Sequence, residues 1–245
     1  MTWVKICGMT NLEDALAAVE AGADAVGFVF YEKSPRNVSV EVARSIVEKL
    51  PENVEKIGVF VDADSDPIDV LRQARLTGTQ SYISAGGIAG SGARSKAIGV
   101  AAVPPHFRSV IAIPMSLFGG DVSQVERMAA GLAESKRQLP KEALFPEGFL
   151  DTFLLDSGNL RQPGGTGHTF DWNKAQGAAE AMRKNGLKLV VAGGLTPENV
   201  GEAIEILRPW GVDVSSGVEA SPGKKDPEKV QAFVRAVREW DRKSG

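Results

Sequence analysis

Cys7, the one cysteine of the 245-residue chain, stands at the end of a short apolar run and directly before Gly8. A lone cysteine is most often a small buried hydrophobe. Its thiolate is nevertheless a nucleophile and a base, and a helix beginning after Asn11 would place the sulfur near a helix N-terminus, where the thiolate is favoured. Cys7 is therefore a candidate catalytic residue. It has no second cysteine with which to form a disulfide within the chain.

Asp156 is a second group that could move protons. It follows the three apolar residues 153–155 and precedes Ser157. A carboxylate at this point could simply cap a turn. If the run is a strand whose end opens onto an active site, the same carboxylate becomes a candidate acid or base.

Two segments with glycine follow two further apolar runs. Gly193 and Gly194 belong to the first, and Ser215, Ser216 and Gly217 belong to the second. Glycine lets the backbone approach an anion closely, while main-chain N–H groups and a helix N-terminus supply donors and positive potential. Either segment alone could be a tight turn, but the two together favour a phosphate-binding site.

Arg36 and Gly165 lie in two segments that carry less specific signals. An arginine in a loop is usually solvated, although its planar fork also suits a bidentate clamp on a carboxylate. Gly165 belongs to the glycine-rich segment 164–167, which could be a mobile linker or a loop that covers a ligand. The spacing leaves both pairs of alternatives open.

Composition argues against several other kinds of site. His106 and His168, together with one cysteine, give no metal-ligand spacing, so we expect no metal site. The formal net charge is -3 and no basic block is present, which argues against nucleic acid but allows a small anionic ligand. No apolar stretch approaches the roughly 18 residues of a membrane span, and the N-terminus lacks the pattern of a signal peptide. We therefore expect a cytoplasmic protein that does not enter the membrane.

Alternating strands and helices must position these residues. Eight short β-rich runs are expected to be strands, at 3–7, 25–30, 56–61, 78–83, 109–115, 152–156, 188–192 and 212–215. Amphipathic segments are expected to be helices at 12–21, 40–50, 67–74, 122–137, 172–184, 197–207 and 227–240. Asn11, Ser39, Thr196 and Asp226 have the residue types and positions of helix N-caps.

This alternation predicts an α/β protein with a parallel sheet. Eight units favour a single (β/α)8-barrel domain over residues 1–245 rather than an open doubly wound sheet, and the first βα turn lacks the glycine pattern of dinucleotide-binding folds. The segments near 84–107 and 138–148 are expected to be insertions. In such a barrel the loops after the strands build the active site, which would bring the candidate residues together.

Six motifs, in this order, resemble those of phosphoribosylanthranilate isomerases: Lys5-Ile6-Cys7-Gly8, Ser34-Pro35-Arg36, Leu154-Leu155-Asp156-Ser157, Gly164-Gly165-Thr166-Gly167 with Phe170-Asp171-Trp172, Gly193-Gly194-Leu195, and Asp213-Val214-Ser215-Ser216-Gly217-Val218-Glu219. The resemblance covers residues 1–76 and 151–240. It implies a (β/α)8 barrel that carries out an Amadori rearrangement in tryptophan biosynthesis without a metal or an organic cofactor.

The resemblance also implies roles for the candidate residues. Cys7 would be the general base, Asp156 the general acid, and Arg36 the clamp for the anthranilate carboxylate. Asp213 would lie near the substrate hydroxyls. The remaining residues expected to bind substrate, mainly through its ribose phosphate, are Gly165, Gly193, Gly194, Ser215, Ser216 and Gly217.

The middle of the chain departs from the pattern of this family. Where such enzymes usually carry Gln-Leu-His-Gly at the fourth strand, this sequence has Gln80-Ser81-Tyr82-Ile83, without the His and the Gly. The alternatives are an isomerase of changed substrate range, another phosphate-binding barrel such as a ribulose-phosphate epimerase or an indole-glycerol-phosphate synthase, or a binding protein without catalysis. We expect a small phosphorylated substrate as the partner, and a monomer or a homodimer.

Overall fold

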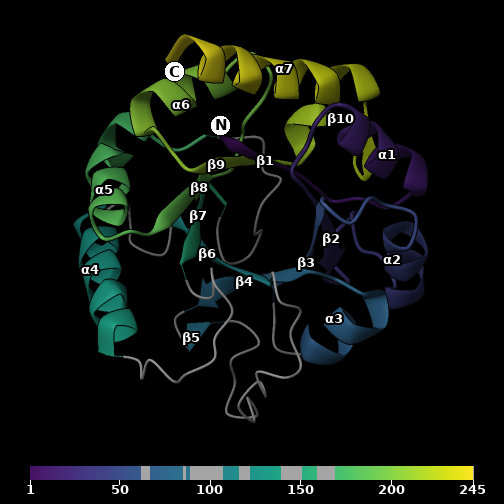
Figure 1. Cartoon of the computed structure of the whole chain (residues 1–245), viewed down its shortest axis with the longest axis horizontal. Coiled ribbons are helices and arrows are strands. Elements are labelled where there is room, and N and C mark those ends of the chain that lie inside the picture. Colours follow the sequence, from purple (N-terminus) through teal and green to yellow (C-terminus); the bar gives the residue numbers. More distant parts are fainter. Residues whose placement is uncertain are drawn as a thin grey trace.

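The computed structural model describes residues 1–61, 67–84, 87–88, 107–115, 122–138, 151–158 and 169–244. Eight parallel strands close into a barrel, and helices cover its outside (Figure 1). The order around the barrel is β1, β2, β3, β4, β6, β7, β8 and β9, and β9 pairs with β1. The predicted (β/α)8 fold is confirmed.

The barrel strands begin and end within one residue of the predicted positions. They are β1 (Trp3–Cys7), β2 (Ala25–Phe30), β3 (Glu55–Phe60), β4 (Gly78–Ser84), β6 (Arg108–Pro114), β7 (Thr152–Asp156), β8 (Lys188–Val191) and β9 (Gly211–Val214). The short strand β5 (Gly87–Ile88) pairs antiparallel with β4. After β9 come the 3-10 turn η3 (Ser216–Val218) and an antiparallel hairpin of β10 (Glu219–Ser221) and β11 (Lys224–Lys225).

Seven helices lie among the described residues: α1 (Leu12–Glu20), α2 (Val40–Val47), α3 (Pro67–Ala74), α4 (Val122–Gln138), α5 (Trp172–Lys184), α6 (Val200–Leu207) and α7 (Pro227–Ser244). Asn11 and Ser39 cap α1 and α2 as predicted, since each side chain accepts a hydrogen bond from a main-chain N–H of the first turn. Within the described ranges, no helix has the length and apolar character needed to cross a membrane. Most of the two predicted insertions, 84–107 and 138–148, lies outside these ranges.

The predicted start of the sixth helix is wrong. α6 begins at Val200, not at residue 197, and its N-cap is Asn199 rather than Thr196. The Asn199 side chain accepts from the Thr196 N–H at 2.8 Å and donates to the Gly194 carbonyl at 2.9 Å. These bonds hold residues 196–199 in a turn, so the helix starts later than the cap pattern indicates.

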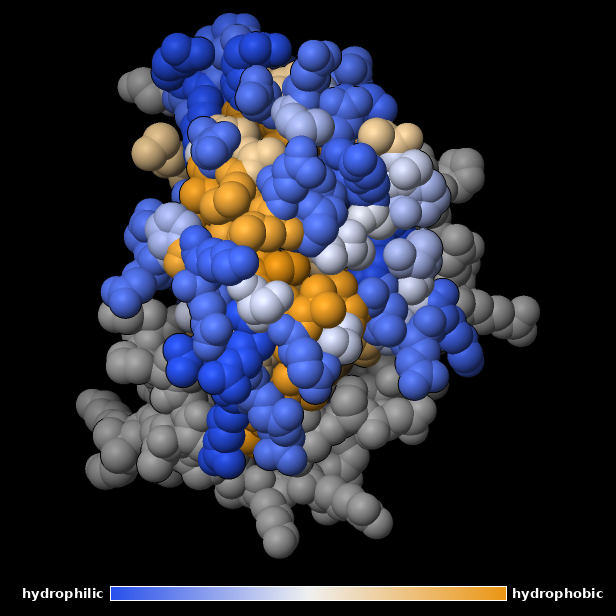
Figure 2. All heavy atoms as spheres, turned by 90° about the vertical axis from the view of Figure 1, so that its right-hand side faces the viewer, coloured by the Kyte–Doolittle hydropathy of each residue, from blue (hydrophilic) through white to orange (hydrophobic). Residues whose placement is uncertain are grey.

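Alternation along each strand divides the side chains between two cores. Outward-facing residues such as Val4 and Ile6 pack beneath the helices, and inward-facing residues such as Val59 and Leu154 fill the barrel. Every second residue of a barrel strand therefore points into the barrel. The face of the molecule that carries α1, α2 and α3 is mostly polar, and a band of apolar side chains runs across it (Figure 2).

Aromatic and charged side chains close the floor of the barrel. Trp3 and Trp210 stack with ring centroids 5.1 Å apart, and the Arg108 guanidinium lies 4.7 Å from the Trp210 centroid. Arg108 also donates two hydrogen bonds to Glu55, at 2.6 and 2.7 Å. These contacts join β1, β3, β6 and the segment before β9 at the amino-terminal end of the barrel. Residues at this end of a (β/α)8 barrel contribute to stability rather than to the active site.

We predict that Gly78→Ala destabilises the barrel. A Cβ at Gly78 would overlap the carbonyl oxygen of Arg108 and lie 2.6 Å from Cδ1 of Ile57, so β3, β4 and β6 would have to move apart. Overpacking of this kind costs about 1–3 kcal/mol of unfolding free energy, which urea denaturation measures. Gly131→Ala in α4 is the control, because among the described residues no atom outside its chain neighbours and its own helix backbone lies within 4 Å of the added Cβ. Equal stability of the two variants would contradict this account of the barrel wall.

Candidate active site

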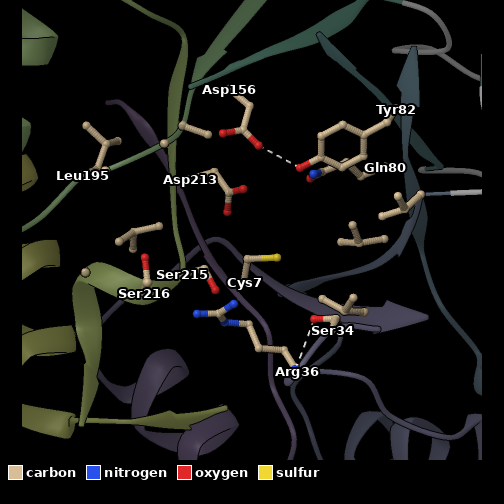
Figure 3. Close-up of a pocket in the computed structure, with 18 of the residues that line it drawn as sticks. Cys7, Ser34, Arg36, Gln80, Tyr82, Asp156, Leu195, Asp213, Ser215 and Ser216 are labelled. Carbon is tan, nitrogen blue, oxygen red and sulfur yellow. Dashed lines mark hydrogen bonds between the residues drawn. The ribbon is translucent and has the colours of Figure 1, made fainter. Parts of the chain in front are cut away.

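A cavity opens at the carboxyl ends of the barrel strands (Figure 3). Its empty space of about 660 Å³ includes open solvent at the mouth. Nine of the residues selected from the sequence line it: Cys7, Arg36, Asp156, Gly193, Gly194, Asp213, Ser215, Ser216 and Gly217. Gly165, His106 and His168 lie outside the described residues. Over the described ranges, no group of three His, Cys, Asp or Glu residues is suited to hold a metal ion.

A buried ion pair lies at the bottom of this cavity. Lys5 on β1 is fully buried, and its ammonium donates to Asp213 Oδ1 at 2.9 Å and to Gln80 Oε1 at 3.0 Å. Lys5 and Asp213 occupy opposite positions on paired strands. Burial lowers the pKa of Lys5, but its interactions with Asp213 and Cys7 outweigh burial and raise that pKa above its ordinary value. Lys5 therefore stays a cation inside the barrel.

Cys7 lies on the same face of β1 as Lys5, closer to the mouth of the barrel. Burial raises the pKa of the Cys7 thiol, and the positive charges of Lys5 and Lys225 oppose this effect without cancelling it. The protein alone therefore favours the neutral thiol, and the contribution expected from the helix N-terminus stays a prediction. The reason is that removing the sulfur from water disfavours its anion more than the nearby charges favour it.

Asp156 lies across the cavity from Cys7, at the end of β7 (Figure 3). The Tyr82 hydroxyl donates to Oδ2 at 2.8 Å, and the Gly158 N–H donates to Oδ1 at 3.0 Å. Burial raises the pKa of Asp156, while these two hydrogen bonds and the charge of Lys5 lower it by a smaller amount. The protonated form that a general acid needs is thus more accessible than in an exposed aspartate.

Arg36 reaches the cavity from the loop after β2. Its side chain is only 12% exposed, so it is not a solvated loop arginine. Nε and Nη2 donate to the two carboxylate oxygens of Glu219 at 2.8 and 2.7 Å. Glu219 also accepts from the buried Lys225 ammonium at 2.9 Å. The guanidinium is therefore held in a fixed orientation at the edge of the cavity.

The glycines after β8 and β9 allow three loops to pack closely. Gly193 has a φ of +85°, and a Cβ there would overlap the Ser157 hydroxyl. A Cβ on Gly217 would overlap the carbonyl oxygen of Leu195. Side chains are therefore excluded at both positions, and the backbone of the two predicted phosphate-binding segments borders the cavity.

A sequence comparison decides which family this barrel represents. The model of the N-(5'phosphoribosyl)anthranilate (PRA) isomerase family matches residues 4–80 and 133–236. The chain belongs to the PRA isomerase family. The unmatched residues 81–132 begin in β4, within the run Gln80-Ser81-Tyr82-Ile83 that departs from the family pattern.

Relatives of full length support this membership. The chain is 42% identical over 239 residues to the PRA isomerase of Pelobacter propionicus, covering 98% of this chain and 97% of the relative. It is 43% identical over 238 residues to that of Rubrobacter xylanophilus, covering 97% and 100%. The crystal structure of the Thermotoga maritima PRA isomerase has a TM-score of 0.71 at 36% identity, with 98% and 100% coverage. A PRA isomerase structure in complex with reduced 1-(o-carboxyphenylamino)-1-deoxyribulose 5-phosphate has a TM-score of 0.69, also at 36% identity, and the match covers 98% of this chain and 100% of that one.

Several residues of this PRA isomerase site had no role in the sequence interpretation. The two-residue alternation of side chains along a strand could have identified three of them. Lys5 shares the inner face of β1 with Cys7, and Gln80 shares the inner face of β4 with Tyr82. Glu219 and Lys225 gave no such signal. Glu219 binds both Arg36 and Lys225, and it does so only because the β10–β11 hairpin places Glu219 and Lys225 beside the loop that carries Arg36.

The single cysteine makes the pKa of Cys7 measurable from thiolate absorbance in the ultraviolet. We predict a midpoint above the ordinary value of about 8.5, because burial outweighs the nearby cations. Lys5→Met combined with Asp213→Asn should move the midpoint further up, since Lys5 affects the thiol more than Asp213 does. The chain unfolded in guanidinium gives the reference. A folded protein that titrates at or below this reference would disprove the assignment of burial as the dominant effect.

Proposed function

We propose that Cys7 and Asp156 are the acid–base pair with which this chain converts N-(5'-phosphoribosyl)anthranilate into 1-(2-carboxyphenylamino)-1-deoxyribulose 5-phosphate, an isomerisation in tryptophan biosynthesis. Membership of the PRA isomerase family supplies the reaction. The assignment of the two residues rests on one observation. A thiol and a buried carboxyl group border the same cavity, beside a guanidinium that is fixed in place.

Asp156 starts the reaction as a general acid. It protonates the furanose ring oxygen, the bond from C1' to that oxygen breaks, and the nitrogen lone pair forms an iminium. The positive charge acidifies the hydrogen on C2'. Cys7 gives its thiol proton to solvent as the iminium forms, removes the C2' proton as the thiolate, and leaves an enolamine, which tautomerises to the ketose. Asp156 takes up a proton from solvent before the next turnover. Each step uses only proton transfers and the substrate's own electrons.

The pKa directions of the two groups fit this order of steps. Burial favours the protonated carboxyl group of Asp156 before the ring opens. The Cys7 thiolate is disfavoured by burial until another positive charge arrives. The iminium supplies that charge next to the two cations, Lys5 and Lys225, that already favour the thiolate. The base thus becomes effective when its substrate proton has become acidic.

The two ends of the substrate are anchored by different groups. Arg36 donates two N–H groups to the Glu219 carboxylate, and its remaining N–H groups are directed to the anthranilate carboxylate. The phosphate is held by the glycine-containing segments, where each charge-assisted hydrogen bond contributes roughly 1.5–3 kcal/mol. These contacts come from Gly193, Gly194, Ser215, Ser216 and Gly217, with Asp213 near the hydroxyls and Gly165 as a further contact.

The chain acts in this proposal as a cytoplasmic monomer or homodimer. A solved structure with 35% identity and a TM-score of 0.66 shows mutually generated monomers of the dimeric PRA isomerase from Thermotoga maritima. Both states are thus compatible with this fold in a relative. Sedimentation of this chain at several concentrations distinguishes them.

Cys7→Ala and Asp156→Asn should each lower kcat by at least about 10²-fold, because positioned proton transfer contributes about 10²–10⁴-fold. The measurement is the fluorescence decrease on consumption of PRA generated in situ. Because both residues serve one reaction coordinate, the double variant should lose less than the product of the two single losses. A folded Cys7→Ala protein with wild-type kcat would remove the thiolate from the mechanism. If the wild-type chain consumes no substrate, the alternative of a binding protein without catalysis is favoured.

Arg36→Met should raise KM about tenfold or more and change kcat much less, because a clamp on a group that does not react contributes mainly uniform binding. Arg44→Met is the control, since Arg44 is half exposed on α2 and pairs with Glu48, the C-cap of that helix. The same fluorescence assay gives both parameters. An unchanged KM in Arg36→Met would show that Arg36 serves only to hold Glu219.

A further inference from the structure

Tyr82 is a buried residue that the reaction steps leave without a role. Its ring packs inside the barrel in the same cluster as Val59 and Leu154. Its hydroxyl reaches from β4 past β6 to the carboxyl group of Asp156 on β7, with 2.8 Å between the hydroxyl oxygen and Oδ2 (Figure 3). A tyrosine two strands away thus contacts the proposed acid directly.

The two oxygens of Asp156 have partners of different kinds. Oδ1 accepts from the Gly158 N–H, and a main-chain N–H can only donate. This bond favours Oδ1 as the oxygen without a proton, so Oδ2 is the oxygen that carries the acidic proton. Oδ2 keeps a lone pair for the Tyr82 hydroxyl while it is protonated. Once the proton has left, the same hydrogen bond has a negatively charged acceptor and becomes stronger.

We propose that Tyr82 is a positioning residue for the acid step: it orients Oδ2 of Asp156 and stabilises the negative charge that develops there during proton transfer. This proposal rests on Asp156 being the general acid. The proton passes from Oδ2 to the ring oxygen of the substrate, and Tyr82 keeps its own proton throughout. A bond that strengthens as charge develops lowers the barrier rather than the energy of the bound substrate.

The phenol itself is unsuited to exchange its proton in the reaction. Burial raises the pKa of Tyr82 well above its ordinary value, and the charge of the neighbouring Asp156 raises it further. Tyr82 therefore remains neutral while Asp156 changes its charge. This behaviour is expected of a permanent donor.

Other charged or titratable groups face the pair from neighbouring strands. Lys5 on β1 favours the carboxylate of Asp156, Asp213 on β9 interacts unfavourably with that carboxylate, and Cys7 on β1 acts on Tyr82. All of them are retained in Tyr82→Phe. The difference between this variant and the wild type therefore isolates the hydroxyl group.

Tyr82→Phe tests the proposal because it keeps the ring and removes only the hydroxyl. We expect kcat to fall about 10- to 100-fold, the effect of losing a donor to a charged oxygen, with KM nearly unchanged. The pKa of Asp156 should rise, because a hydrogen bond that favours its carboxylate is lost. A carbon-13 NMR titration of the Asp156 carboxyl carbon, assigned by comparison with Asp156→Asn, measures this change without substrate. A melting temperature close to that of the wild type verifies that the variant is folded.

The outcomes separate this proposal from the one on which it rests. An unchanged kcat, or a rise in KM alone, in folded Tyr82→Phe overturns the role of Tyr82 if Asp156→Asn is inactive. An unchanged midpoint of the Asp156 titration also overturns it, because the hydroxyl would then make no bond of consequence to the acid. Full activity of Asp156→Asn overturns the assignment of the acid itself, whatever Tyr82→Phe shows.

Discussion

The buried ion pair between the Lys5 ammonium and Asp213 is the interaction on which the rest of the site depends. A charge without solvent contact is tolerated only when it is paired and hydrogen-bonded, and Lys5 meets this condition with Asp213 on β9 and Gln80 on β4. The strands must keep their register, because a shift of one residue would turn Lys5 out of the barrel. Toward the floor the interior is a packed core, and toward the mouth it becomes a cavity.

The same cation sets the conditions for the acid and the base. Lys5 lowers the pKa values of both Cys7 and Asp156, but burial raises both and has the larger effect. Both groups are therefore biased towards their neutral forms by the protein. In the proposed mechanism, negative charge appears on them only when the substrate contributes a positive charge. The site thereby avoids holding a reactive thiolate when no substrate cation is present.

A second network fixes the charge that faces the proposed carboxylate end of the substrate. Glu219 holds Arg36 through two hydrogen bonds and is itself paired with Lys225. The Lys225 ammonium also donates to the main-chain oxygen of Ser215 at 3.1 Å, which ties the β10–β11 hairpin to the end of β9. Because these groups are already oriented, little reorganisation is needed when a ligand binds.

The sequence by itself determined the barrel and the strand ends that carry chemistry. The hydrophobic periodicity of a strand or a helix depends only on residues close together in the sequence, and all eight barrel strands begin and end within a residue of their predicted positions. The positions of Cys7, Asp156 and Gly193 at such ends were enough to place them on one face. Only the tertiary structure decided their partners: Tyr82 and Asp156 are 74 residues apart, and Lys5 and Asp213 are 208 apart. The direction of the Cys7 pKa shift also escaped the sequence. Desolvation depends on everything that surrounds the sulfur, and those surroundings exist only once the barrel has closed.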